Sequence, residues 1–158
     1  DAGYRSLVCF DYAPAGAAAA RKIFGARLRE GGGEAEIDVA DMRDLPYRAG
    51  SFDAAMEKGT LDAVYLSGGR DPERKRECLE MAMREMARVL VRGGGLFSIS
   101  AACTEAIKLA FEQAKMSEDA QEPVWRCIRD TGENLWITEE EGYASNNVDG
   151  TIMVWEKL

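Results

Sequence analysis

The chain has 158 residues, which is enough for one globular domain and too few for two domains of ordinary size. With 46% hydrophobic and 30% charged residues, the composition is that of a globular protein and excludes a disordered chain or a fibrous repeat. The net charge of −8 argues against binding to duplex nucleic acid, and the absence of histidine excludes Ser/His/Asp triads, Cys/His dyads and histidine-ligated zinc within this polypeptide.

The amino-terminal third alternates between strand and helix signals. Residues 6–10 form a short apolar run, which predicts a strand buried on both faces. Apolar residues recur at helical spacing over residues 17–28, and Pro14 suits the first turn of such a helix. The glycines at 31–33 are predicted to end this helix, and residues 35–39 predict the next strand.

The central part of the chain predicts two further strands and two helices. Residues 52–56 are a short strand candidate. The clearest helix covers residues 71–91, where apolar side chains recur at helical spacing, and the triple glycine at 93–95 is predicted to terminate it. Residues 96–100 then predict a buried strand, and residues 104–114 return to helical spacing.

The carboxy-terminal part predicts two strands, over residues 124–128 and 151–155, paired antiparallel at the edge of a sheet. Alternating strands and helices predict an α/β fold with a mainly parallel sheet, in a single domain over residues 1–158. Because open α/β sheets bind ligands beyond the carboxyl ends of their strands, the residues that follow each strand are the candidate binding residues.

The cysteines and the apolar runs indicate the cellular compartment of the protein. The four cysteines, at positions 9, 78, 103 and 127, lack CxxC spacing and predict reduced, buried thiols rather than a metal site. No run approaches the ~20 apolar residues of a membrane helix, and no secretion signal is visible, which predicts a cytoplasmic protein. The acidic balance suits a basic protein partner better than nucleic acid or a membrane surface.

Acidic residues follow three of the predicted strands, at Asp11, Asp41 and Glu57. An acid between a strand and a helix, such as Asp11, is well placed to accept hydrogen bonds from a ribose 2′,3′-diol, although a helix-capping aspartate is the alternative. The carboxylate of Asp41 suits an adenine amino group, and its apolar neighbour Met42 suits the face of the ring. Taken alone, this second pair is a weak signal.

Several motifs in a fixed order carry a resemblance to a known family. They are FDYAP at 10–14, DVADMRDLPY at 38–47, SFDAAMEKGTLDAV at 51–64, GGRDP at 68–72 and REMARVLVRGGGLFSIS at 84–100. Over about residues 1–114 the chain resembles class I S-adenosylmethionine-dependent methyltransferases. Within that superfamily it most resembles the eukaryotic elongation factor 1A lysine methyltransferase-like group, and the EKGTLDA phrase is the most discriminating part of the match.

The resemblance implies a Rossmann-like sheet, S-adenosylmethionine as cofactor and methyl transfer to a lysine of a basic protein substrate. It implies that Asp11, with Tyr12 beside it, binds the cofactor ribose. By the same resemblance, Asp41 and Met42 contact the adenine. The resemblance also implies that Lys58 lies beside the methionine part of the cofactor and binds it.

The resemblance also implies that Glu57 and Lys58 lie at the site of methyl transfer. The segment 60–62 would form the rest of the wall of this site. Transfer from a sulfonium to an amine needs a neutral, positioned amine and an in-line approach. A nearby carboxylate such as Glu57 is suited to orient the amine or to accept its proton. The alternative for Glu57 and Lys58 is a surface ion pair at the end of a strand.

The chain departs from the family pattern in two ways. Arg92 stands where the family usually has a proline before its glycines, a change that should leave the turn intact. No GxGxG motif occurs in the chain, so the family's glycine-rich first motif is absent together with its strand and helix. That strand lies centrally in the family's sheet, between the strands that would end at Asp11 and Glu57, and its ~10 backbone hydrogen bonds are worth roughly 1 kcal/mol each.

We therefore expect the chain to be the amino-terminally incomplete part of a longer protein, in preference to a reorganised fold or another segment filling the gap. Two other functions remain open on the sequence alone. One is a methyltransferase-like scaffold or binding subunit without catalysis, which the missing glycine motif favours. The other is a small-molecule methyltransferase, which the acidic charge does not exclude.

Overall fold

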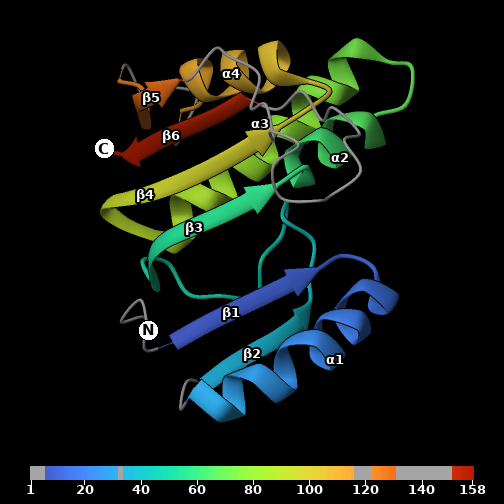
Figure 1. The fold of residues 1–158 in the computed structure, drawn as a ribbon. Coiled ribbons are helices and arrows are strands. Elements are labelled where there is room, and N and C mark those ends of the chain that lie inside the picture. The colour runs from blue at the N-terminus through green and yellow to red at the C-terminus, as the bar shows by residue number, and fades with distance from the viewer. Residues whose placement is uncertain (1–5, 32–33, 116–121, 131–150) are drawn as a thin grey trace, which may run out of the picture. The chain divides into compact units, whose positions relative to one another are not determined.

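The computed structural model describes residues 6–31, 34–115, 122–130 and 151–158. Its contacts divide the chain into two compact units, residues 1–46 and residues 47–158. Two separate sheets correspond to these units, one of two strands and one of four (Figure 1). The single domain over residues 1–158 that the chain length indicates stays a prediction.

The first unit is a βαβ arrangement. Strand β1 (Ser6–Asp11) runs parallel to β2 (Glu34–Val39), and helix α1 (Pro14–Gly31) connects them. Pro14 opens the helix, as expected for a residue without a backbone N–H at a helix start. The guanidinium of Arg21 donates to the carbonyl of Ile37 and so ties α1 to β2. The three elements predicted over this region are confirmed, each one or a few residues longer than its pattern. The prediction that the first strand is buried on both faces is wrong: no residue of β1 is buried, because among the described strands it pairs with β2 alone.

The second unit is a mixed four-stranded sheet with three helices. Its strands are β3 (Phe52–Lys58), β4 (Leu90–Ser100), β5 (Trp125–Asp130) and β6 (Thr151–Lys157), and its helices are α2 (Thr60–Ser67), α3 (Pro72–Val89) and α4 (Thr104–Gln113). The strand order is β3-β4-β6-β5, parallel between β3 and β4 and antiparallel for the other two pairs. The α/β class and the antiparallel carboxy-terminal edge are therefore confirmed.

Helix α3 follows directly from its sequence pattern. Asp71 caps its first turn by accepting from the backbone N–H groups of Glu73 and Arg74 at 3.0 and 3.5 Å. The apolar stripe is buried, as the helical spacing predicts: Cys78, Leu79, Ala82, Met83, Met86 and Val89.

Three aromatic rings fix α4 to the antiparallel edge of the sheet. The ring of Phe111 stacks on that of Trp155, with centroids 4.5 Å apart, and meets the ring of Trp125 edge-on at 5.5 Å. The largest fully buried side chains of the unit include Trp155 and Phe111 together with Leu61, Leu79, Met83, Leu90, Leu96, Ile107 and Met153. The core of this unit is thus formed by one face of the sheet and the helices that cover it.

The triple glycine at 93–95 does not end a helix, and that prediction is wrong. Helix α3 ends at Val89, and β4 runs through the glycines. Phe52 pairs with Leu90 whereas Ala54 pairs with Gly95, so two steps along β3 match five along β4. The extra residues form a bulge in which Gly93 has a φ of +78° and a Cβ on Gly94 would lie 2.8 Å from the carbonyl oxygen of Val91.

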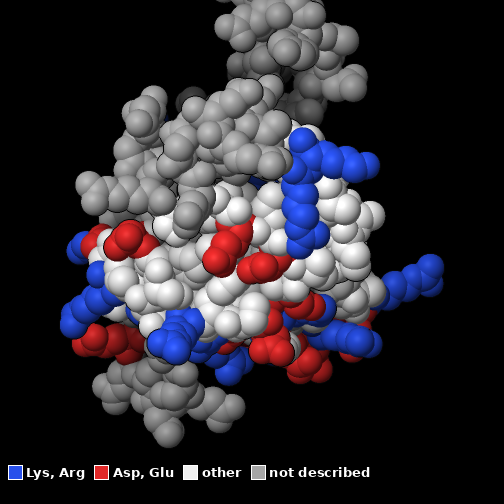
Figure 2. All heavy atoms as spheres, turned by 90° about the horizontal axis from the view of Figure 1, so that it is seen from below, with Lys and Arg blue, Asp and Glu red and all other residues white. Residues whose placement is uncertain are grey.

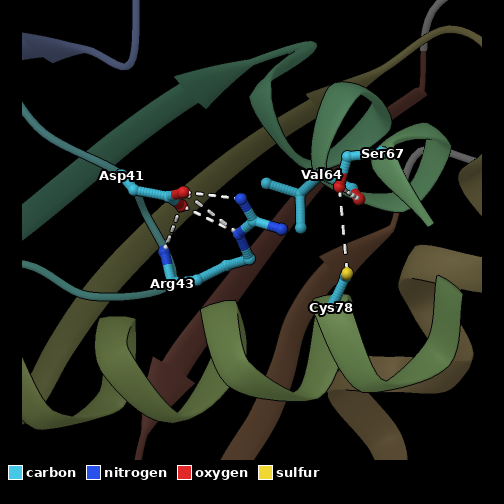
Figure 3. A network of polar contacts seen from close by, with 5 residues as sticks. All are labelled: Asp41, Arg43, Val64, Ser67 and Cys78. Carbon is cyan, nitrogen blue, oxygen red and sulfur yellow. Dashed lines mark hydrogen bonds and ion pairs between the residues drawn. The ribbon is translucent and has the colours of Figure 1, made fainter. Parts of the chain in front are cut away.

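Helix α2 has no counterpart among the predicted elements. It is only eight residues long, lies between Gly59 and Gly68, and buries Leu61 and Val64. Figure 3 shows its last turn, where the hydroxyl of Ser67 donates to the carbonyl of Val64 at 2.6 Å and lies 3.8 Å from the Cys78 sulfur on α3. The two short apolar spacings within α2 were too little signal to identify a helix.

The cysteines agree in part with expectation. None of the four, all within the described ranges, forms a disulfide. Only Cys78 is buried, however, and Cys127 is exposed on β5, so the prediction of uniformly buried thiols is wrong. Cys127 lies on the edge strand β5, in which Trp125 is the one buried residue.

Charged groups of both signs are interspersed on the face drawn in Figure 2. On α3, Glu80 lies between Arg76 and Arg84, within 3.4 and 3.7 Å of their guanidinium groups. Such exposed pairs contribute little to stability.

In the described part of the chain, no helix is both long enough and apolar enough to span a membrane.

Candidate functional site

Asp11 is the last residue of β1 and precedes α1, as the sequence predicts. Its Oδ1 accepts a hydrogen bond from the backbone N–H of Ala13 at 2.8 Å. Its Oδ2 accepts none from the part of the chain that the structure describes. The capping alternative therefore uses one oxygen and leaves the other available to a ribose hydroxyl. Tyr12, beside it, is 73% exposed.

Asp41 follows β2 at the same end of the two-stranded sheet as Asp11, because β1 and β2 are parallel and in register. The backbone agrees, since the N–H of Ala40 donates to the carbonyl of Asp11 at 3.1 Å. The two predicted cofactor-binding acids of the first unit thus follow neighbouring strands. Met42, predicted to cover the adenine, is buried.

The carboxylate of Asp41 is held by Arg43 (Figure 3). Oδ2 lies 2.6 Å from the Nη2 of Arg43, while Oδ1 accepts from the backbone N–H and the Nε of the same residue at 2.9 and 3.0 Å. These hydrogen bonds and the guanidinium charge outweigh desolvation and lower the pKa of Asp41. An adenine amino group at Asp41 would therefore share an acceptor that Arg43 already uses.

Glu57 lies near the end of β3 and is buried, with 5% of its surface exposed. Its Oε2 accepts from the backbone N–H groups of Thr60 and Leu61 at 2.9 and 3.2 Å, and its Oε1 accepts from the hydroxyl of Ser98. These contacts cap α2, whose own N-cap residue, Gly59, has no side chain to do so. Burial raises the pKa of Glu57, and the three hydrogen bonds offset only part of that effect.

Lys58 points to the other face of β3 and is exposed. No ion pair joins it to Glu57 among the described residues, which argues against the surface ion pair as the reason for this dipeptide. The following residue, Gly59, turns the chain with a φ of +71° and donates its N–H to the carbonyl of Ile99 at 2.9 Å. Lys58 therefore stands at the start of a fixed turn beyond the carboxyl end of β3.

Asp62 makes more hydrogen bonds in this region than the sequence predicts. The resemblance implies only that it helps to form the wall of the methyl-transfer site. It is buried on α2 and accepts from the hydroxyl of Ser100 and the backbone N–H of Cys103, both at 2.8 Å. It also accepts from the N–H groups of Ala101 and Ala102 at 3.2 and 3.3 Å. Asp62 thus holds the turn that leads from β4 into α4, whose own N-cap residue, Cys103, makes no side-chain cap.

The Glu57 and Asp62 carboxylates fix the turns that follow β3 and β4. These two strands are parallel neighbours, so both turns lie at the edge of the sheet where ligands of α/β folds bind. Burial, and next the negative charge of Asp62, raise the pKa of the Cys103 thiol. Asp11 and Asp41 thus form one pair of acids in the first unit, and Glu57 and Asp62 form another in the second.

Comparison with known proteins identifies what the chain is similar to. A family model described as "Methyltransferase domain" matches residues 1–98. EEF1A lysine methyltransferase 4 from Bos taurus and that from Mus musculus are each 38% identical to the chain over 69 residues. That stretch covers 41% of this chain and 27% of each relative, so the chain matches about a quarter of the length of these proteins.

Solved structures share the fold at low sequence identity. A SAM-dependent methyltransferase from Methanosarcina mazei has a TM-score of 0.54 and 19% identity, over 97% of this chain and 82% of that one. The N-methyltransferase NodS from Bradyrhizobium japonicum has a TM-score of 0.57 and 16% identity, over 96% and 73%. A further NodS structure, with a TM-score of 0.56 and 16% identity over 96% and 66%, is a complex with S-adenosyl-L-homocysteine.

Proposed function

This chain belongs to the methyltransferase domain family, whose methyl donor is S-adenosylmethionine, and on that premise we propose that it takes part in methylating a lysine of a protein substrate. The observation that carries the proposal is the 38% identity over 69 residues with two proteins named as EEF1A lysine methyltransferases. The substrate proposed first is therefore eukaryotic elongation factor 1A, or a basic protein like it. The net charge of −8 supports a basic partner, and the proposed location is the cytoplasm.

The residues of the first unit suit the nucleoside part of the cofactor. Asp11 keeps one carboxylate oxygen available for the ribose hydroxyls, and the exposed ring of Tyr12 lies next to it. Asp41 supplies an acceptor for the adenine, whereas the side chain of Met42 is buried in this structure and its contact with the ring rests on the resemblance alone. Because Arg43 already engages Asp41, an adenine amino group would add to an existing hydrogen-bonded pair rather than find a lone carboxylate.

The residues of the second unit suit the acceptor side. The bound cofactor supplies an electrophilic methyl group, so the protein has to orient the lysine amine and let it lose its proton. The side chain of Lys58 is exposed at the carboxyl end of β3, next to a turn that Glu57 holds. Because both oxygens of Glu57 accept hydrogen bonds from this chain, the contacts favour a positioning role for Glu57 over that of proton acceptor.

Methyl transfer to elongation factor 1A tests the proposal directly. The protein is incubated with isotopically labelled S-adenosylmethionine and purified factor, and mass spectrometry locates the label. We expect labelling of one lysine, no labelling of a factor in which that lysine is replaced by arginine, and strongly reduced labelling by Asp11→Ala. Label on small-molecule amines but on no protein would instead support the small-molecule methyltransferase.

A scaffold without catalysis is the second candidate, because the chain contains no GxGxG motif to pack against the cofactor. Calorimetric titration with S-adenosylmethionine separates the two candidates. Heat of binding that Asp11→Ala abolishes supports the enzyme. Absence of heat at millimolar cofactor, in a sample whose circular dichroism shows a folded α/β protein, contradicts catalysis by this chain and supports the scaffold.

A further inference from the structure

Gly16, in the first turn of α1, lies against the carboxylate of Asp11. A Cβ atom built on Gly16 would be 2.3 Å from the Oδ2, 2.5 Å from the Cγ and 2.9 Å from the Oδ1 of Asp11. All three distances are shorter than non-bonded carbon contacts allow. Any side chain at position 16 would therefore force the carboxylate out of its present place.

The main chain of Asp11 has little freedom to give way instead. Asp11 pairs with Val39 at the end of the parallel ladder, and its carbonyl accepts from the N–H of Ala40 at 3.1 Å. The carboxylate is also fixed by the N–H of Ala13, which donates to Oδ1 at 2.8 Å. A methyl group at position 16 would consequently be accommodated by rotation of the Asp11 side chain, which breaks this hydrogen bond and redirects Oδ2.

The surrounding sequence shows that helix formation does not call for a glycine here. Position 16 interrupts a run of alanines, Ala15 and Ala17–Ala20. In a helix interior glycine is less favourable than alanine by about 1 kcal/mol. Backbone conformation gives no reason for it, since Gly16 is not among the glycines with positive φ. Close approach of the carboxylate is what the structure offers as the reason.

We propose that Gly16 is a positioning residue for cofactor binding: its missing side chain leaves the space from which the Asp11 carboxylate presents Oδ2 to the vicinal hydroxyls of a ribose. The inference rests on the proposed function, because it requires Asp11 to bind the cofactor ribose. Gly16 itself makes no contact with the ligand in this scheme and acts through Asp11 alone.

The test is a double-mutant cycle with S-adenosylhomocysteine as the probe. Gly16→Ala should weaken binding about tenfold or more, as expected when a hydrogen bond to a charged group is lost. In an Asp11→Ala background, Gly16→Ala should change the affinity less than twofold. For the 2′,3′-dideoxy analogue of the probe, Gly16→Ala and the wild type should bind equally, a result that general damage to the helix would not produce.

Further measurements test the role of Gly16 even if Gly16→Ala lowers the stability of the protein. Ala19→Gly, at an exposed position of the same helix, is the matched control and should lower stability but leave affinity unchanged. The amide proton of Ala13 should exchange faster in Gly16→Ala than in the wild type. If Gly16→Ala fails to fold while Asp11→Ala/Gly16→Ala folds, the clash with Asp11 is confirmed as the cause.

The outcomes separate this inference from the proposed function. Wild-type affinity in Gly16→Ala, together with weakened binding in Asp11→Ala, overturns the role of Gly16 and leaves the proposed function intact. Wild-type affinity in Asp11→Ala overturns the ribose assignment and the inference with it. Absence of binding by the unaltered chain overturns both.

Discussion

At the scale of single residues, the two carboxylates of the second unit show how a sequence motif and its geometry can suggest different roles. Glu57 was predicted as a catalytic group from its place in the EKGTLDA phrase. In the structure its oxygens accept three hydrogen bonds from the chain, two from the first turn of α2 and one from Ser98. Substitution by glutamine preserves these contacts and removes the ability to take a proton, so it separates the two roles.

We predict that Glu57→Gln leaves methyl transfer within a few-fold of the wild type. The amide oxygen can still accept from Thr60 and Leu61, and its NH2 group can donate to the hydroxyl of Ser98. Glu57→Ala, which removes the cap, should reduce transfer much more. A loss of ~100-fold or more in kcat for Glu57→Gln would contradict this and assign proton transfer to Glu57.

The raised pKa of Glu57 also predicts how stability depends on pH. Because burial raises this pKa in the folded state, the folded protein holds the proton more tightly than the unfolded chain. Its stability therefore falls as pH rises through the interval between the ordinary glutamate value and the raised one. We expect Glu57→Gln to lack this slope and to be at least as stable as the wild type above the interval, as measured by urea unfolding at a series of pH values.

Asp41 should respond to pH in the opposite sense. Arg43 lowers its pKa, so the pair stabilises the folded state above the ordinary aspartate value and loses this effect as pH falls through the lowered one. We expect Arg43→Gln to raise the pKa of Asp41 towards its ordinary value, measured from the carboxyl carbon signal by NMR. The stability change should stay below about 1 kcal/mol, because both side chains are about a third or more exposed.

At the scale of helices and strands, periodicity and end signals predicted the long elements well. The buried stripe of α3 and the Asp71–Pro72 start both follow from local rules. The prediction for the glycines at 93–95 is wrong because a triple glycine after a helical pattern resembles a helix end, whereas these glycines lie in a bulge between paired strands. That role depends on the long-range pairing of β3 with β4, which a local pattern does not contain.

The bulge leaves different amounts of space for a side chain at the adjacent glycines Gly94 and Gly95. A Cβ on Gly94 would lie 2.8 Å from the carbonyl oxygen of Val91 and 3.1 Å from that of Asp53, and neither backbone atom can move away easily. On Gly95 the nearest atom would be 3.9 Å away. We expect Gly94→Ala to cost about 1–3 kcal/mol of unfolding free energy and Gly95→Ala about 0.5 kcal/mol or less, measured by urea denaturation. Equal costs would show that the bulge relaxes.

The hydrogen bonds that Asp62 accepts from the turn between β4 and α4 predict that stability depends strongly on this side chain. Asp62→Ala would leave the buried hydroxyl of Ser100 and three backbone N–H groups without their acceptor, at a cost of roughly 2–4 kcal/mol. Asp71→Ala is the matched control, because Asp71 caps its own helix at an exposed position and its loss should cost only about 1 kcal/mol. Equal losses in chemical denaturation would contradict the special role of Asp62.

At the scale of the whole molecule, the sequence predicted the fold class and the candidate residues better than it predicted their chemistry. Asp11 and Glu57 lie at or near the carboxyl ends of β1 and β3, and Asp41 follows β2, close to where the alternating pattern places them. The partners of these acids were not predictable, because Arg43 reaches back to Asp41 through a turn and Ser98 reaches Glu57 from a strand 41 residues away. Hydrogen bonds between distant segments depend on register, and register is a property of the assembled sheet.

The two sheets also predict unequal stability along the chain. The first unit has two strands and one helix, and β1 has no fully buried residue, whereas β4 in the second unit buries five of its eleven. A two-stranded sheet has little apolar burial to stabilise it. Amides of β1 should therefore exchange with solvent through local opening about tenfold or more faster than those of β4, as hydrogen exchange followed by NMR would report.

Ligand binding should change the difference in hydrogen exchange between β1 and β4. If Asp11 and Asp41 bind the nucleoside part of the cofactor, S-adenosylhomocysteine stabilises the closed form of the first unit by mass action and should slow exchange in β1 more than in β4. Asp11→Ala should remove the difference, and Ala19→Gly should retain it. Equal exchange in β1 and β4 without ligand would show instead that the chain opens as one cooperative domain, as its length alone suggests.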